Sequence, residues 1–139
     1  MRVEVFRIQL NTKGNNDIID ITADIAARLT ESGLKKGIAC VSVIGSTASI
    51  TTMEYEPALV TDMKRLFEKI APSGVGYEHD KTWGDANGYS HLRASLLGPS
   101  VTIPFEDGGL CLGTWQQIVL LDFDNRHRKR DIRLHFTGV

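Results

Sequence analysis

The chain has little cysteine, no long apolar run and almost no net charge. Its two cysteines among 139 residues, Cys40 and Cys111, lie far apart beside apolar residues, which predicts two buried free thiols and a cytoplasmic protein. No apolar run approaches the ~20 residues that a membrane helix needs, so we expect no membrane partner. Residues 1–5 alternate in charge and lack the apolar core of a signal peptide. The net charge of −1 provides no positive field, so we expect no nucleic-acid partner.

Repeats, low-complexity tracts and flexible linkers are also missing. The 4 prolines and 13 glycines stand mostly singly, at the boundaries of expected elements. The hydrophobic fraction of 42% and the charged fraction of 24% are typical of globular proteins. A chain of this length buries roughly two thirds of its unfolded surface and needs no disulfide or structural metal to fold. We therefore expect one domain over residues 1–139.

Short β-branched or apolar segments separated by turn residues predict six or seven strands. The segments expected to form strands are residues 3–10, 38–44, 47–53, 101–105, 110–121 and 130–136. The segments 38–44 and 47–53 are expected to pair as a hairpin across Gly45 and Ser46. The segments 101–105 and 110–121 are expected to pair across residues 107–109, with a bulge at Gly113.

Apolar residues at helical spacing predict two or three helices. The first covers residues 21–32, with Asp20 as its cap and Gly33 after its end. The second begins at Pro57 and ends before residues 72–74. The third is short and covers residues 91–97, after a structured loop over 75–90. The sequence thus predicts an α+β fold, mainly an antiparallel β-sheet or sandwich with two or three flanking helices.

Residues 77–91 form the densest cluster of polar and aromatic side chains, in a segment predicted to be a loop. His79 and His91 could bind a divalent metal, zinc or magnesium, with Asp80, Asp85 or Glu54 adding a carboxylate. Their spacing matches no standard zinc motif. The alternative is that each histidine only forms hydrogen bonds within an ordered loop.

Polar residues elsewhere have both a functional and a structural interpretation. Glu54 could belong to a site or complement a helix N-terminus, a role that suits Glu56 better. Trp115 could be a core or interface residue, and a buried Gln116 amide would need a ligand or subunit contact. The basic run 126–130 is either solvated or an anion site, and Arg93 is a second anion-binding candidate.

Motifs distributed over nearly the whole chain resemble the YjbQ-like family, also called the secondary thiamine-phosphate synthase family. The segment from Ser95 to Ile118, with Gly98 and a Gly-Thr-Trp-Gln motif at 113–116, carries the resemblance most specifically. The other matching segments are Gly-Ser-Thr-Ala at 45–48, Glu54, Tyr-Glu-His-Asp at 77–80, Asn-Gly at 87–88, the segment 91–98 and Pro104.

The resemblance implies a homotrimer with clefts between subunits and a transferase that acts on a phosphorylated small molecule. The reaction would join a pyrimidine pyrophosphate to a thiazole phosphate with loss of pyrophosphate, as a weak side activity. The resemblance maps the polar site onto Glu54, His79, Asp80, Asn87, His91, Trp115 and Gln116, and Arg93 joins it as the anion-binding candidate. We expect Glu54, Asp80 and His91 to act in catalysis, Asn87, Arg93, Trp115 and Gln116 to bind substrate, and His79 with His91 to bind a metal. A non-catalytic trimeric metal- or phosphometabolite-binding protein is the alternative function.

Position 45 departs from the family pattern. Many relatives have a histidine where this chain has Gly45. If that histidine is a metal ligand, only His79 and His91 remain here, and a carboxylate or water would have to complete the site.

Overall fold

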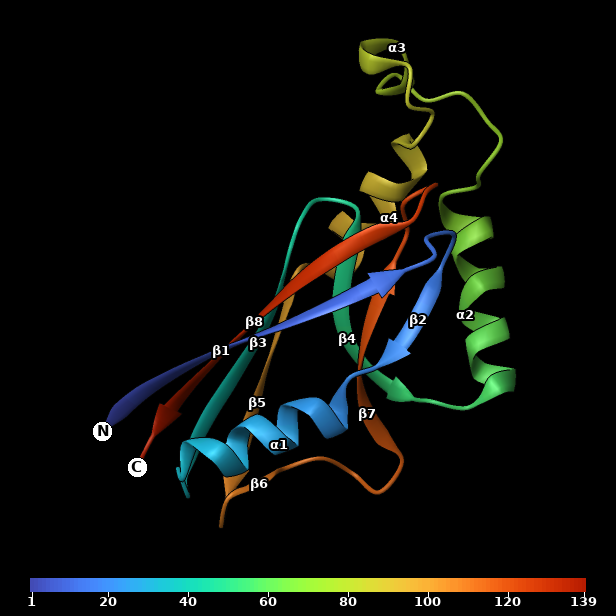
Figure 1. Cartoon of the computed structure of the whole chain (residues 1–139). Coiled ribbons are helices and arrows are strands. Elements are labelled where there is room, and N and C mark those ends of the chain that lie inside the picture. Colours follow the sequence, from blue (N-terminus) through green and yellow to red (C-terminus); the bar gives the residue numbers. More distant parts are fainter.

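Eight strands and four helices make up the fold in the computed structural model, which describes residues 1–139 (Figure 1). The strands are β1 (Arg2–Thr12), β2 (Asp17–Asp20), β3 (Gly37–Ile44), β4 (Ala48–Glu54), β5 (Ser100–Glu106), β6 (Gly109–Leu110), β7 (Gln116–Asp122) and β8 (Arg128–Gly138). The helices are α1 (Thr22–Ser32), α2 (Pro57–Ile70), α3 (Asp80–Trp83) and α4 (Gly88–Leu97). The predicted α+β class is confirmed. No helix combines the length and apolar character needed to cross a lipid bilayer.

The strands form two antiparallel sheets. The larger sheet has the order β1-β8-β3-β5-β6, and the smaller has the order β2-β7-β4. Side chains of β7 alternate between two cores: Ile118 and Leu120 pack with the larger sheet and α1, while Val119 and Leu121 pack beneath α2 and α4. The smaller sheet is therefore a middle layer that is buried on both faces.

The predicted helix starts follow from local hydrogen bonding. The N-cap of α1 is Ile21 rather than the predicted Asp20 and makes no side-chain cap bond, but Asp20 Oδ1 accepts a hydrogen bond from the Thr22 N–H at 2.9 Å. Glu56 accepts hydrogen bonds from the Ala58 and Leu59 N–H groups at the start of α2. This confirms Glu56, rather than Glu54, as the residue that serves the N-terminus of that helix.

The predicted hairpin of residues 38–44 and 47–53 is wrong. β3 pairs with β5 and β8 in the larger sheet, whereas β4 pairs with β7 in the smaller one. Residues 45–47 therefore cross between layers instead of reversing the chain within one sheet. Gly45 adopts φ +136° at this crossing, a conformation that side chains other than hydrogen disfavour.

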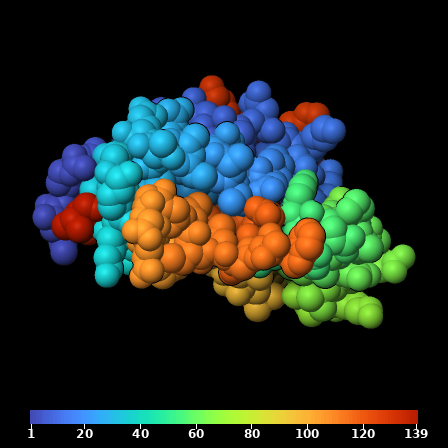
Figure 2. Space-filling model, turned by 90° about the horizontal axis from the view of Figure 1, so that it is seen from below, coloured from blue at the N-terminus to red at the C-terminus, as the bar shows by residue number.

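The predicted long strand 110–121 is also wrong, because only Gly109 and Leu110 pair with β5. The chain then leaves the larger sheet and re-enters at β7 in the smaller one. Figure 2 shows this connecting segment, coloured orange, on the lower surface of the molecule. Cys111 in this segment is exposed and Cys40 is half-buried, so both thiols are free as predicted but neither is fully buried.

Three segments meet at the end of the molecule where α3 and α4 lie (Figure 1). The Phe123 N–H donates to the Thr47 carbonyl at 2.9 Å, which joins the end of β7 to the layer crossing. Ser90 Oγ in α4 donates to the Phe123 carbonyl, and Asn125 Nδ2 donates to the Asp85 carbonyl at 2.7 Å. These bonds hold the walls of the pocket described next.

Candidate functional site

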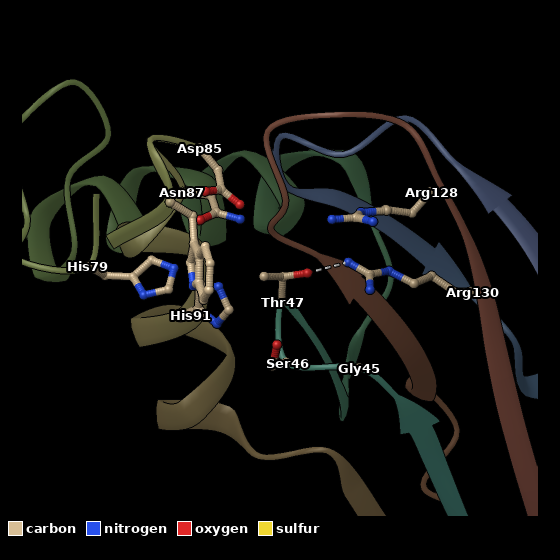
Figure 3. Close-up of a pocket in the computed structure, with 10 residues that line it drawn as sticks. Gly45, Ser46, Thr47, His79, Asp85, Asn87, His91, Arg128 and Arg130 are labelled. Carbon is tan, nitrogen blue, oxygen red and sulfur yellow. Dashed lines mark hydrogen bonds between the residues drawn. The ribbon is translucent and has the colours of Figure 1, made fainter. Parts of the chain in front are cut away.

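A polar pocket of about 320 Å³ lies where these three segments meet. Figure 3 shows the two histidines with Asp85 and Asn87 on one side and the two arginines on the other, with Thr47 between them. The residues that line the pocket are Gly45, Ser46, Thr47, His79, Trp83, Asp85, Asn87, His91, Arg128 and Arg130. Only Trp83 among them is hydrophobic, so recognition in this pocket depends on hydrogen bonds and charge.

Arg130 in β8 is held by a buried carboxylate at the end of β7. Its Nε and Nη2 donate to the two oxygens of Asp122 at 2.6 and 2.7 Å, and Nη2 also donates to Thr47 Oγ1 at 2.8 Å. Asp122 is completely buried and Arg130 is 6% exposed. The orientation of the Arg130 guanidinium group is therefore fixed, and Nη1 is its one nitrogen without a partner in this network.

Arg128 is held in the same way two residues earlier. Its Nε donates to Oδ2 of Asp124 at 2.7 Å, and Asp124 is also completely buried. Burial raises the pKa of Asp124, but hydrogen bonds from Arg128, the Asn125 N–H and Thr47 outweigh burial and hold that pKa below its usual value. The carboxylate is thus ionised at neutral pH and fixes a second guanidinium beside the pocket.

His79 and His91 lie together on the opposite wall. Their ring centroids are 4.4 Å apart and the rings are tilted by 59°. Burial lowers the pKa of His91, and the neighbouring His79 lowers it further. His91 is therefore neutral at neutral pH, with one ring nitrogen able to accept a proton and the other able to donate a hydrogen bond.

Asn87 brings an unpaired amide oxygen to the same wall. The residue is 4% exposed, and its Oδ1 is the one buried side-chain atom in the chain without a hydrogen-bond partner. Leaving such an acceptor unpaired costs roughly 1–3 kcal/mol. This oxygen is enclosed within the wall and does not face the pocket, so Asn87, which lines the pocket, offers a ligand its amide N–H groups as donors.

A second hollow of about 360 Å³ continues from the pocket along α4 and shares Gly45, Ser46 and His91 with it. Its remaining lining is small and uncharged, and includes Ala94 and Ser95. The two hollows together offer a charged end and a neutral end.

Two residues predicted to act on substrate have all their polar atoms engaged inside the fold. Asp80 accepts the Gly88 N–H through Oδ1 at 2.9 Å and the Tyr77 N–H through Oδ2 at 3.1 Å, so it closes the loop that carries His79 and Asn87. Arg93 is 1% exposed. Its three guanidinium nitrogens donate to the Ala71 carbonyl, Asn16 and Glu68.

Glu54, Trp115 and Gln116 do not lie in the pocket. Glu54 pairs with Gln116 at the ends of β4 and β7, where both are exposed. Gln116 accepts the Gly113 N–H at 3.0 Å and donates to Thr52 Oγ1 at 3.2 Å, so the expectation of a buried amide is wrong. Trp115 is 72% exposed in the loop before β7 and is not a core residue. In Figure 1 this loop lies at the opposite end of the molecule from α3.

Asp122 and Asp124 were not among the residues predicted for the site. The signal that could have found them is two carboxylates directly after an apolar strand and shortly before a basic run. Arg128 and Arg130 were candidates only as part of that run. The structure places both of them on the pocket, which supports the anion-site alternative over a solvated surface.

The residues present do not fit a resident metal ion within one chain. No group of three His, Cys, Asp or Glu side chains is arranged to hold a metal. The histidine pair offers two ligands, and two guanidinium groups face it across the pocket.

Known proteins resemble this chain over nearly its full length. The sequence model of the family described as "UPF0047 protein YjbQ-like" matches residues 6–139. A UPF0047 protein of Archaeoglobus fulgidus is 41% identical over 90% of this chain and 95% of its own, and the Bacillus subtilis UPF0047 protein YugU is 34% identical over 84% and 87%.

Solved structures agree with the fold. A YbjQ-like protein of unknown function from Sulfolobus solfataricus matches with a TM-score of 0.90 at 28% identity, covering 99% of this chain and 100% of that one. An uncharacterised protein of the same family from Clostridium acetobutylicum matches with a TM-score of 0.86 at 33% identity, covering 95% and 99%.

Proposed function

This chain belongs to the UPF0047, YjbQ-like family, and we propose that its pocket binds a phosphorylated small molecule and transfers the organic group with loss of pyrophosphate. The observation that carries the proposal is the pair of guanidinium groups, each held by a buried aspartate, facing a histidine pair across one pocket. The named example is the joining of a pyrimidine pyrophosphate to a thiazole phosphate, which the family resemblance suggests.

The arginine wall suits the leaving group of this reaction. As the new bond to the pyrimidine-bearing carbon forms, the bond from that carbon to the pyrophosphate oxygen breaks, and pyrophosphate departs with the electron pair. Arg128 and Arg130 would stabilise the negative charge that develops on it. Because their carboxylate partners already fix both guanidinium groups, little reorganisation is needed during the step.

The opposite wall suits the organic part of the ligand. The carboxylate of Asp85 is an acceptor, so it favours N–H or O–H groups there. The neutral hollow along α4 leaves room for an uncharged ring. His91, neutral at neutral pH, would donate a ring N–H to the oxygen of the breaking bond.

The direct test mixes purified protein with the two precursors and follows thiamine phosphate and released pyrophosphate. We expect slow turnover that His79→Ala or His91→Ala abolishes, because both imidazoles border the reacting groups. His135→Ala, on the exposed outer side of β8, is the matched control and should retain the rate. Unchanged rates in both pocket variants would overturn the assigned site.

The alternative is a protein that binds a phosphorylated metabolite without converting it. A thermal-shift screen of phosphorylated metabolites, followed by analysis of each stabilising compound for chemical change, separates the two functions. A metabolite that raises the melting temperature and remains unchanged, together with no turnover of the two precursors, would favour this alternative.

We also propose that three copies assemble head to tail, so that Glu54, Trp115 and Gln116 of one copy approach the histidine wall of the next. The exposure of Trp115 and its distance along the molecule from α3 support this arrangement, since a heterologous contact closes into a ring. Light scattering should give the mass of a trimer. Mixing His91→Ala with Trp115→Ala protein should restore activity that each variant lacks, and a monomer without restoration would exclude the shared site.

A further inference from the structure

The layer crossing places the backbone of Gly45 against the guanidinium group of Arg130. A Cβ atom added at Gly45 would lie 2.9 Å from Arg130 Nη1, closer than side-chain atoms tolerate. The Gly45 φ of +136° also disfavours any residue with a Cβ. Space at this corner of the pocket therefore exists only because position 45 is glycine.

We propose that Gly45 determines the specificity of the pocket, because its missing side chain lets Arg130 Nη1 bind a phosphoryl oxygen directly and without a metal ion. This inference rests on the proposed binding of a phosphorylated molecule and deepens it. Arg130 is then the cationic group that binds the phosphoryl oxygen at the charged end of the pocket.

The hydrogen bonds of Arg130 restrict its contact with a ligand to one nitrogen. Nε and Nη2 are taken by Asp122 and Thr47, and the residue is almost completely buried. Nη1 carries two N–H groups and lies beside Gly45 on the pocket. A phosphoryl oxygen placed there would meet a charged donor whose direction is already fixed, in a contact made by one nitrogen of the guanidinium group.

The charge around this corner opposes a divalent cation. Arg128 and Arg130 both line the pocket, and their countercharges, Asp122 and Asp124, lie fully buried behind them. Asp85 is the one carboxylate lining the pocket, and in Figure 3 it lies with Asn87 on the wall away from the arginines. An anion is therefore favoured beside Gly45, and donor groups are favoured beside Asp85.

The test measures binding of inorganic pyrophosphate by isothermal titration calorimetry with EDTA present throughout. We expect wild-type protein to bind, and Gly45→Ala to bind at least tenfold more weakly because its Cβ displaces Nη1. Gly33→Ala is the control: its φ of +71° is also positive, but no atom lies within 4 Å of the added Cβ. This variant should bind pyrophosphate like the wild type.

Arg130→Lys provides a second route if Gly45→Ala does not fold. Lysine keeps the positive charge beside Asp122 but lacks a second nitrogen that reaches past Gly45, so at least a tenfold loss of affinity is again expected. Binding that requires added Mg²⁺ or Zn²⁺, or equal affinity in Gly45→Ala and Gly33→Ala, would overturn the inference and leave the proposed function standing. Absence of pyrophosphate binding under every condition would overturn both.

Discussion

Replacing Asp122 with asparagine should destabilise the protein more than any comparable change at its surface. Asp122 is completely buried and accepts four hydrogen bonds: two from Arg130, one from Thr12 Oγ1 and one from the Asp124 N–H. Asparagine has one acceptor oxygen in place of two, and its NH₂ group would face donors. At least one nitrogen of Arg130 would then lose its acceptor, and the buried guanidinium would lose its countercharge.

The size of the effect follows from this loss of pairing. Removing one partner of a buried ion pair costs about 3–5 kcal/mol, because the remaining charge stays buried without compensation. Domains of this size are stable by only about 5–15 kcal/mol, so Asp122→Asn should remove a large part of the total. For a chain of this length the melting temperature should fall by about 10–20 °C.

Urea unfolding followed by circular dichroism measures the change directly. The midpoint should fall while the slope with urea stays constant, which indicates that stability rather than compactness has changed. Asp131→Asn is the matched control, because Asp131 also pairs with two arginines, Arg7 and Arg133, but at the surface. The free energy of unfolding lost in Asp131→Asn should be much smaller than that lost in Asp122→Asn, because solvent screens its ion pairs. Equal losses in the two variants would refute the argument that burial makes the Asp122 pair essential.

Two further effects should be measurable. The pKa of Asp124 lies below its usual value in the folded protein, so ionised Asp124 stabilises the fold at pH values above the unfolded pKa of 3.8. This stabilisation is lost as the pH falls through the folded pKa. Urea unfolding at neutral pH and at about pH 3 should therefore show a larger loss of unfolding free energy at low pH in the wild type than in Asp124→Asn. Phe67→Ala should lower the free energy of unfolding, measured in urea, by about 3–5 kcal/mol, because the buried Phe67 ring packs edge-on against Phe123 with ring centroids 4.8 Å apart. Leu66→Ala is the control and should cost much less, because Leu66 is half-exposed.

The sequence predicted elements well where the pattern was long and local. The alternation of Ile132, Leu134 and Phe136 matches β8, whose residues at these positions are completely buried. The apolar spacing of Ile25 and Leu29 matches α1 in the same way. Such patterns are set by one buried face, which a single segment displays in its own sequence.

Strand partners could not be predicted in the same way. A Gly-Ser step between two apolar strands is as compatible with a crossing between layers as with a hairpin, and only packing decides. Ala48, Ser49 and Ile50 are buried in succession because β4 belongs to a middle layer. Residues 118–121 are also buried on both faces of the smaller sheet, so their sequence is uniformly apolar. For this reason they were predicted to continue the strand that begins near residue 110, although that strand ends at Leu110.

The candidate site was predicted in part for a related reason. The sequence brought His79, His91 and Asn87 together because they share one polar segment, and the structure places all three around the pocket or its wall. The sequence could not show that Asp80 and Arg93 form hydrogen bonds within the fold instead of binding a ligand. A polar side chain whose partners are backbone groups of its own fold has the same identity and spacing as one whose partner is a ligand.

Unsatisfied hydrogen-bonding capacity is what separates the two kinds of buried polar residue in this chain. Arg93 and Arg130 are both nearly inaccessible, but Arg93 uses all three nitrogens within the fold while Arg130 leaves Nη1 on the pocket. Nη1 of Arg130 therefore remains able to donate to a group bound in the pocket. A ligand with an anionic group for Arg130 Nη1 binds the folded protein alone, so its binding should be coupled to the stability of the whole domain.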